Sequence, residues 1–169
     1  MRRIACVCCS FTTHFSAVDI ARHSAWQDAC RAYARGFTDS AVAAGVLADR
    51  IRLSDPYVTK VLEPTEAVLE VMVRAGFDDE HAMRVLSLLA NICLGYARDV
   101  ATAARSGVTP RPYILRKALD RRDAADFETL ARIADLPVTT YDERQFELSV
   151  DLFISGAEAL LRDLTRDRD

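Results

Sequence analysis

One long helix with two apolar faces, predicted over residues 141–164, constrains this chain more than any other feature. At about 100° per residue, the first apolar stripe of this segment consists of Phe146, Val150, Phe153, Ala157, Leu160, Leu161 and Leu164. The second stripe points roughly the opposite way and consists of Leu148, Leu152, Ser155 and Ala159. The chain's own core can cover only one of these stripes. We therefore expect a second subunit to cover the other.

The composition is that of a folded, helix-rich protein. Half of the 169 residues are apolar, and six glycines and five prolines are few for this length. The net charge of −3 argues against a nucleic-acid-binding surface, which needs concentrated lysine and arginine. No apolar run approaches the ~20 residues of a membrane span. Five cysteines, an odd number, indicate a reducing compartment, so we expect a cytoplasmic protein.

Hydrophobic periodicity predicts helices separated by short breaks and gives no strand signal, so the expected fold class is all-α. A first helix begins near residue 25 after a capping-box spacing of Ser24 and Gln27, and it can kink at Gly36. A break is expected at Ser54-Asp55-Pro56. The remaining predicted helices cover residues 65–75, 81–105, 115–122, 124–134 and 142–164.

The segment 81–105 is apolar around nearly its whole circumference, which predicts a central, buried helix. The acidic residues 78–80 precede it, where they favour the positive end of the helix dipole. Pro110 and Pro112 predict a loop after it. Asp142 is placed to cap the final helix. Cys30 and Cys93 fit as small buried side chains within helices.

Residues 1–23 show no reliable period and are expected to form an irregular N-terminal segment, followed by a helical domain over 24–169. The sulfur and imidazole groups of this segment match no strong zinc template, so no metal site is expected at Cys6, Cys8, Cys9, His14 and His23. His81 and the acids beside it fit a helix start better than an acid–base site. No phosphate loop, nucleophile elbow or paired C-x-x-C is present. The sequence therefore predicts neither an enzyme nor a cofactor.

Four segments carry a resemblance to a known family, in the family's order. They are WQDACRAYARGF, EAVLEVMVRAGFDDEHAMRVLSLLANICLGYA, DFETLARIAD and DERQFELSVDLFISGAEALL. Together they resemble the C-terminal regulatory domain of the tetracycline-repressor (TetR) family of bacterial transcription regulators. The resemblance implies an all-α bundle that binds a small effector between its helices. It also implies a homodimer through a four-helix bundle made by residues 81–105 and 142–164 of both subunits.

The interface residues that follow from this resemblance and from the second stripe are Leu86, Ala90, Leu94, Ala97, Leu148, Leu152, Ser155 and Ala159. Candidates for the effector pocket are polar or aromatic residues in otherwise apolar helices, namely Trp26, Tyr33, Phe37, Met72, Asn91, Tyr96 and Phe127. Simple core packing is the alternative for each aromatic residue. The Asn91 amide needs a buried partner, which a ligand or the second subunit could supply.

TetR-family members begin with about fifty residues that form a helix-turn-helix unit. Here only the residues 1–24 precede the first matching helix. Thr13-His14-Phe15 echoes the end of the family's recognition helix, and the alternative is that these are ordinary surface and loop residues. We therefore expect an effector-binding and dimerisation module with an absent or truncated DNA-binding unit, which does not bind specific DNA alone. The alternative is a stand-alone helical dimerisation protein without effector sensing.

Overall fold

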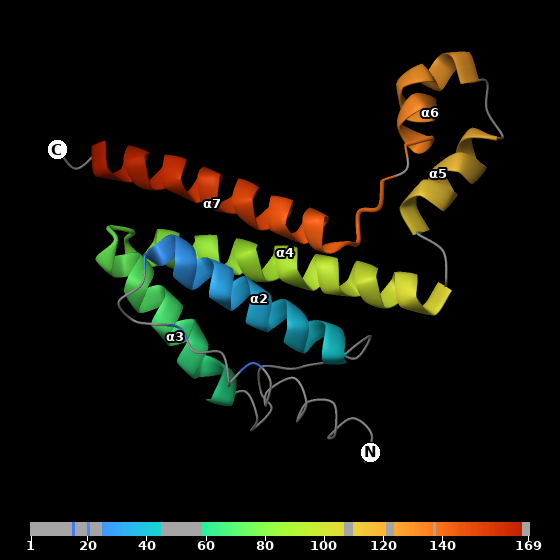
Figure 1. The fold of residues 1–169 in the computed structure, drawn as a ribbon. Helices are drawn as coiled ribbons and strands as arrows, with labels where there is room; N and C mark the ends of the chain where they lie inside the picture. The colour runs from blue at the N-terminus through green and yellow to red at the C-terminus, as the bar shows by residue number, and fades with distance from the viewer. Residues whose placement is uncertain are drawn as a thin grey trace.

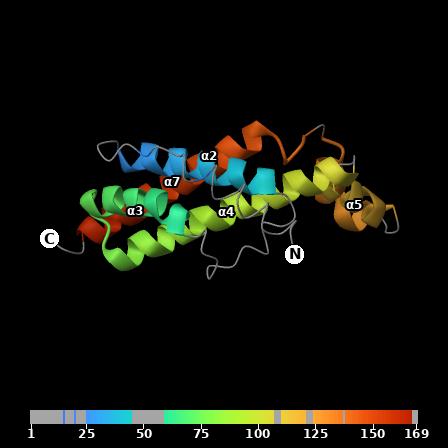
Figure 2. The ribbon, with the colours of Figure 1, turned by 90° about the horizontal axis from the view of Figure 1, so that it is seen from below.

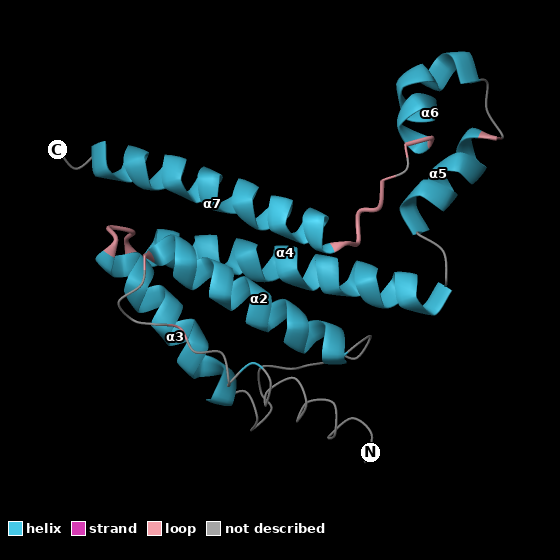
Figure 3. Cartoon of the chain, viewed as in Figure 1, coloured by secondary structure: helices cyan, strands magenta, loops and turns pink. Residues whose placement is uncertain are grey.

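The computed structural model describes residues 15, 20, 25–44, 59–106, 110–120, 124–136 and 138–166. All regular structure in these residues is helical, which confirms the all-α prediction (Figure 1 and Figure 3). The α-helices are α2 (Trp26–Ala44), α3 (Thr59–Arg74), α4 (Asp79–Ser106), α5 (Pro110–Leu119), α6 (Glu128–Ala134) and α7 (Glu143–Arg166). A short 3-10 helix, η2 (Ala124–Phe127), precedes α6.

The helices α2, α3, α4 and α7 pack together as a bundle, in which α7 runs antiparallel alongside α4 (Figure 1). Figure 2 shows these helices extending in the same general direction, with α5 at the C-terminal end of α4. The residues 110–136, here called the arm, hold α5, η2 and α6 and project from that end. The arm packs mainly on itself and reaches the bundle at α4.

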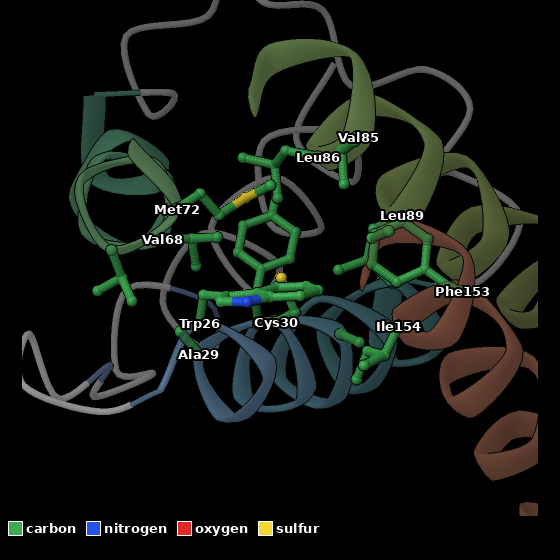
Figure 4. Close-up of a cluster of buried hydrophobic side chains, with 14 of the residues drawn as sticks. Trp26, Ala29, Cys30, Val68, Met72, Val85, Leu86, Leu89, Phe153 and Ile154 are labelled. Carbon is green, nitrogen blue, oxygen red and sulfur yellow. The ribbon is translucent and has the colours of Figure 1, made fainter. Parts of the chain in front are cut away.

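The core lies between the inward faces of the four bundle helices (Figure 4). Each helix contributes apolar side chains at helical spacing, such as Cys30 from α2, Met72 from α3, Leu89 from α4 and Phe153 from α7. Burial of this apolar surface is the main favourable contribution to the fold. The free Cys30 and Cys93 are both buried, as predicted.

Two helices are capped at their N-termini by the residues that the sequence predicts. The Oδ1 atom of Asp78 accepts a hydrogen bond from the His81 backbone N–H at 2.8 Å, which caps α4. The Oδ1 atom of Asp142 accepts one from the Gln145 N–H at 2.9 Å, which caps α7. Gly76 ends the turn after α3 with φ of 112°, a conformation that side chains other than glycine disfavour.

Several helix boundaries differ from the prediction. The helix α2 continues through Gly36 to Ala44, because one glycine lowers helix stability without breaking it. The helix α3 begins at Thr59 and contains Pro64, whose buried ring compensates for the missing N–H. The helix α5 begins at Pro110, because prolines are tolerated in a first turn that needs no N–H donors. The predicted break at residues 54–56 lies outside the described residues.

Of the predicted capping box at the start of α2, Ser24 lies outside the described residues. The Gln27 side-chain amide donates to the Glu158 carboxylate of α7 at 2.9 Å. The prediction that α4 is buried all around is also wrong. Met83 and Leu88 are 56% and 55% exposed, because only one face of this helix packs within the chain.

Candidate functional site

An aromatic cluster lies at the centre of the core, where α2 meets α3 and α4. Trp26 and Tyr33 of α2 are buried there together with Met72 of α3. The ring of Trp26, which is labelled in Figure 4, packs edge-on against the Phe77 ring with 5.3 Å between the two ring centroids. The structure thus places three of the predicted pocket residues in the same hydrophobic core, and these residues with the rings that pack on them are here called the cluster. The fourth, Phe37, packs half-buried against it.

Phe15 joins this cluster from the N-terminal segment. Its ring is fully buried and lies edge-on to Tyr33 at 5.2 Å and to Phe37 at 5.3 Å. Tyr33 and Phe37, one helical turn apart, are stacked at 5.7 Å. The interpretation of residues 13–15 as surface and loop residues is therefore wrong for Phe15. The apolar ring is buried because α2 offers it two aromatic partners.

Among the described residues, every buried polar side chain is uncharged. These side chains include Thr38 and Ser40, which are 4% and 0% exposed. The Ser40 hydroxyl donates to the Gly36 carbonyl at 2.7 Å. The Cys93 thiol donates to the Ala34 carbonyl at 3.6 Å. The Thr38 hydroxyl has no hydrogen-bond partner within the described structure. Its proximity to the Cys93 thiol offsets a small part of the rise in that thiol's pKa that burial causes.

Burial keeps these groups uncharged. It raises the pKa of Cys30 from 9.0 to about 12 and that of Tyr33 from 10.0 to about 12. The pKa of Cys93 rises from 9.0 to about 11, again through burial. The thiolate and phenolate forms are disfavoured because a low-dielectric interior penalises charge. This region can therefore offer hydroxyl and thiol hydrogen bonds to an apolar molecule, and it holds no counter-charge for an ion.

Tyr96 lies apart from the main cluster, at the contact between α4 and α7. Its ring packs on Phe146 at 5.2 Å, and its hydroxyl donates to the Tyr141 carbonyl at 3.4 Å. Burial raises the Tyr96 pKa, with a smaller contribution from Glu143. The Arg35 guanidinium lies 4.7 Å from the Phe146 ring centre, and it pairs with Glu143. These contacts tie Tyr96 to the α2–α7 junction.

Asn91 and Phe127 are not part of the cluster. Asn91 is exposed on the outer side of α4. Phe127 belongs to η2 in the arm and is 37% exposed. The prediction that Phe127 faces inward is therefore wrong, because the arm packs mainly on itself and its main contact with the bundle is between α5 and α4.

A second candidate region is the outer side of α4 and α7, here called the open face. Leu88, Leu148 and Leu152 are 55%, 50% and 64% exposed on it. The face is defined by its exposed residues, which are Leu88 and Asn91 from α4 and Leu148, Leu152, Ser155 and Ala159 from α7. The second apolar stripe of the final helix is thus left uncovered by the chain's own core.

The predicted interface residues of α4 lie elsewhere on the helix. Leu86 and Ala97 are 4% and 3% exposed, so they are already covered within the chain. They share an inward stripe with Cys93, whose thiol reaches α2. Ala90 and Leu94 are half-buried at the edge of this stripe. Sequence reasoning missed Leu88, although its spacing of three residues from Asn91 places both on one side of the helix.

Among the described residues, no group of three or more histidine, cysteine or acidic side chains is arranged to hold a metal ion. Cys6, Cys8, Cys9, His14 and His23 lie outside the described residues. None of the described helices is long and apolar enough to cross a bilayer.

Comparison with protein families decides the identity of this helical domain. The family model for the "Tetracyclin repressor-like, C-terminal domain" matches residues 21–161. The chain belongs to this TetR-like family. Searches among curated proteins and among solved structures returned no match. TetR-like C-terminal domains generally dimerise and bind small-molecule effectors, and TetR-family regulators are generally non-enzymatic transcription regulators.

The family match gives the two candidate regions of this TetR-like domain a shared context. The aromatic cluster lies between helices, where small-molecule sites of helical proteins occur. The open face is an apolar surface on two long, adjacent helices, which suits a helix-bundle contact. Both regions belong to the matched residues, apart from Phe15 of the cluster.

Proposed function

We propose that this chain is the effector-binding and dimerisation module of a TetR-type transcription regulator. Two copies would form a homodimer through a four-helix bundle of α4 and α7 from each. The open face is the observation that supports this assembly most directly. Three leucines at half exposure or more, on adjacent helices, form an apolar patch larger than scattered surface residues would give.

The outer sides of α4 and α7, of which the open face is the central part, are large enough for a stable dimer. The 24 residues of α7 extend about 36 Å, at about 1.5 Å per residue. Two helices side by side are about 20 Å wide, so these outer sides together offer roughly 700 Å² per chain. A typical specific interface buries about 800 Å² per partner. Asn91 lies on this face, so we assign its amide to the subunit contact in preference to the effector site.

The effector site in this proposal is the aromatic cluster around Trp26, Tyr33, Phe37 and Met72. The unpartnered Thr38 hydroxyl supports it, because a buried unpaired hydroxyl costs roughly 1–3 kcal/mol and a ligand that bonds to it relieves this cost. The neutral interior favours an uncharged, largely apolar effector. An ion would lose its hydration there and gain no opposite charge.

The assembly is tested by sedimentation of the wild-type chain together with Leu152→Arg. We expect a wild-type dimer at micromolar concentration and a monomer for Leu152→Arg, because a desolvated, unpaired charge is costly. Thr165→Arg is the matched control, since Thr165 is exposed on α7 away from the open face and should leave the dimer intact. A wild-type monomer would overturn the proposed assembly.

The effector site is tested by a thermal-shift screen of uncharged aromatic and aliphatic compounds. Compounds that bind only the native state raise its melting temperature by mass action. Tyr33→Phe and Thr38→Val should weaken the response to hydroxyl-bonding compounds, while Asn91→Leu should retain it. If no compound shifts the melting temperature of the dimer, the stand-alone dimerisation protein without effector sensing becomes the better description.

A further inference from the structure

Two glycines in the interior of long helices have no explanation within the chain. Gly95 lies inside α4 and Gly156 inside α7. Glycine lowers helix stability more than any residue except proline, so a glycine inside a helix needs a reason. Among the described glycines, only Gly76 has a positive φ, so backbone conformation does not supply that reason.

Close packing within the chain does not explain these glycines either. A Cβ atom built on Gly95 or Gly156 would meet no neighbouring atom within 4 Å outside its own stretch of helix. By contrast, a Cβ atom on Gly76 would lie 3.5 Å from Leu161 Cδ1. The space above Gly95 and Gly156 is therefore open in a single chain.

Both glycines lie on the sides of α4 and α7 that border the open face. Gly95 is seven residues after Leu88, which places both on one side of α4. Gly156 is one helical turn after Leu152 on α7. The two helices are held side by side where Tyr96 packs on Phe146. The line along which α4 and α7 adjoin is here called the seam, and helical spacing places each glycine beside an exposed leucine on the outer side of its helix.

We propose that Gly95 and Gly156 are the positions where a helix of the second subunit approaches the α4–α7 seam at backbone distance. This inference rests on the proposed homodimer and specifies how its helices meet. The space above each glycine is open and lies next to an exposed leucine, so the leucines of one copy would pack over the glycines of the other. Such knobs-into-holes packing selects one register between two identical surfaces.

The Gly156→Ala variant tests this role, because it should weaken the dimer if Gly156 contacts the partner and should stabilise the chain if it does not. In an isolated helix, alanine stabilises, and it would raise the melting temperature of the chain by roughly 2–4 °C. At a close helix contact, the added methyl group would collide with the partner and raise the dimer dissociation constant about tenfold or more. We expect the second result in sedimentation equilibrium, with unchanged or higher helix content by circular dichroism.

Gly95→Ala should weaken the dimer in the same way, and Gly156→Leu should produce a folded monomer. Thr165→Ala is the control, because it raises helix propensity on α7 away from the seam and should leave the dissociation constant unchanged. A wild-type dimer that tolerates Gly95→Ala and Gly156→Leu would overturn this inference alone. A wild-type monomer would overturn the proposed dimer and this inference together.

Discussion

At the scale of single residues, the inward side of α2 combines aromatic rings with thiol and hydroxyl groups. Trp26, Cys30 and Tyr33 follow one another at helical spacing on this side, and each is almost completely buried. Such a surface packs well against apolar neighbours, and it is penalised when one of its groups ionises. The free energy of unfolding should therefore depend on pH through the ionisation of these groups.

We expect the free energy of unfolding to fall as the pH rises above 9. Burial raises the folded pKa of Cys30 from 9.0 to about 12, so between these values the native state retains a proton that the unfolded state has lost. The stabilising contribution is complete below pH 9 and is lost as pH rises toward the folded value, by up to about 1.4 kcal/mol per pH unit for one group. Urea unfolding between pH 8 and 11 measures the slope.

The Cys30→Ala variant provides the comparison for this alkaline effect. It should be less stable at pH 8, because it loses packing, and its stability should fall less steeply above pH 9. Equal slopes for the variant and the wild type would contradict the assignment of the proton to Cys30.

Phe15→Ala should cost about 3–5 kcal/mol of unfolding free energy, the usual range for deleting a fully buried ring. Phe15 is 0% exposed and contacts both Tyr33 and Phe37, so its removal leaves a gap beside α2. Phe127→Ala is the control, because that ring is 37% exposed, and its effect should be clearly smaller. Comparable losses in urea denaturation would show that residue 15 is not anchored in the core.

The sequence predicted which residues are apolar more reliably than which neighbour covers them. Trp26, Tyr33 and Met72 are buried together as hydrophobic spacing indicates. Asn91 could not be placed in this way, because an amide within an apolar helix suits a ligand site and a subunit contact equally well. Asn91 is exposed in the single chain because of how α4 is rotated about its own axis, and long-range packing on α2 determines that rotation.

At the scale of secondary-structure elements, capping residues fix where the two longest helices begin. Asp78 and Asp142 each accept a hydrogen bond from the backbone N–H three residues later. The Asp78 carboxylate also contacts the His81 ring at 2.8 Å, so this side chain packs beside the cap. Phe146, in the first turn of α7, packs on Tyr96 of α4.

Asp142→Ala should lower the unfolding free energy by about 1 kcal/mol, because the Gln145 N–H then loses its side-chain acceptor and keeps only the Asp142 carbonyl at 3.1 Å. Asp142→Asn should retain most of the stability, since an amide oxygen can accept the same bond. Chemical denaturation of the three proteins at one concentration measures the difference. Equal stability of the alanine and asparagine variants would mean that the cap contributes little.

Prolines were the main source of error in the predicted helix boundaries. Pro110 indicated a loop, although a proline at the first helical position begins α5. Pro64 lies within α3, where its burial offsets a lost hydrogen bond. Local sequence cannot separate these outcomes, because the packing of the ring decides between them. The helix α7 was predicted within two residues at each end, since a cap and two apolar stripes define it.

At the scale of the whole molecule, the family match and the open face both support the proposed pairing of two chains. The bundle core could be predicted from the sequence because its stripes are strong. The arm could not, because Leu130 and Ile133 have helical spacing and yet are 43% and 46% exposed. Periodicity identifies an apolar side of a helix, and it does not show whether the chain itself covers that side.

The 169-residue chain alone should not bind operator DNA with nanomolar, sequence-dependent affinity. The segment 1–24 supplies only Arg2, Arg3 and Arg22 as permanent cations, and the chain carries a net charge of −3. Base recognition by a helix-turn-helix also needs a supported helix in the major groove and nearby phosphate contacts. Fluorescence anisotropy with DNA from its own promoter at physiological salt measures the affinity. Tight binding that unrelated DNA does not compete for would contradict the prediction.

Contacts between α2 and α7 can form only after the last helix has been synthesised. Arg31 and Asp151, which pair across these helices, are separated by 120 residues, and Gln27 and Glu158 by 131. Contacts between such distant segments form late, because closing a long loop is entropically costly. During translation, the apolar sides of α2 and α4 must wait for α7 to emerge from the ribosome. A nascent chain that pauses before residue 143 would therefore be a target for chaperones and proteases.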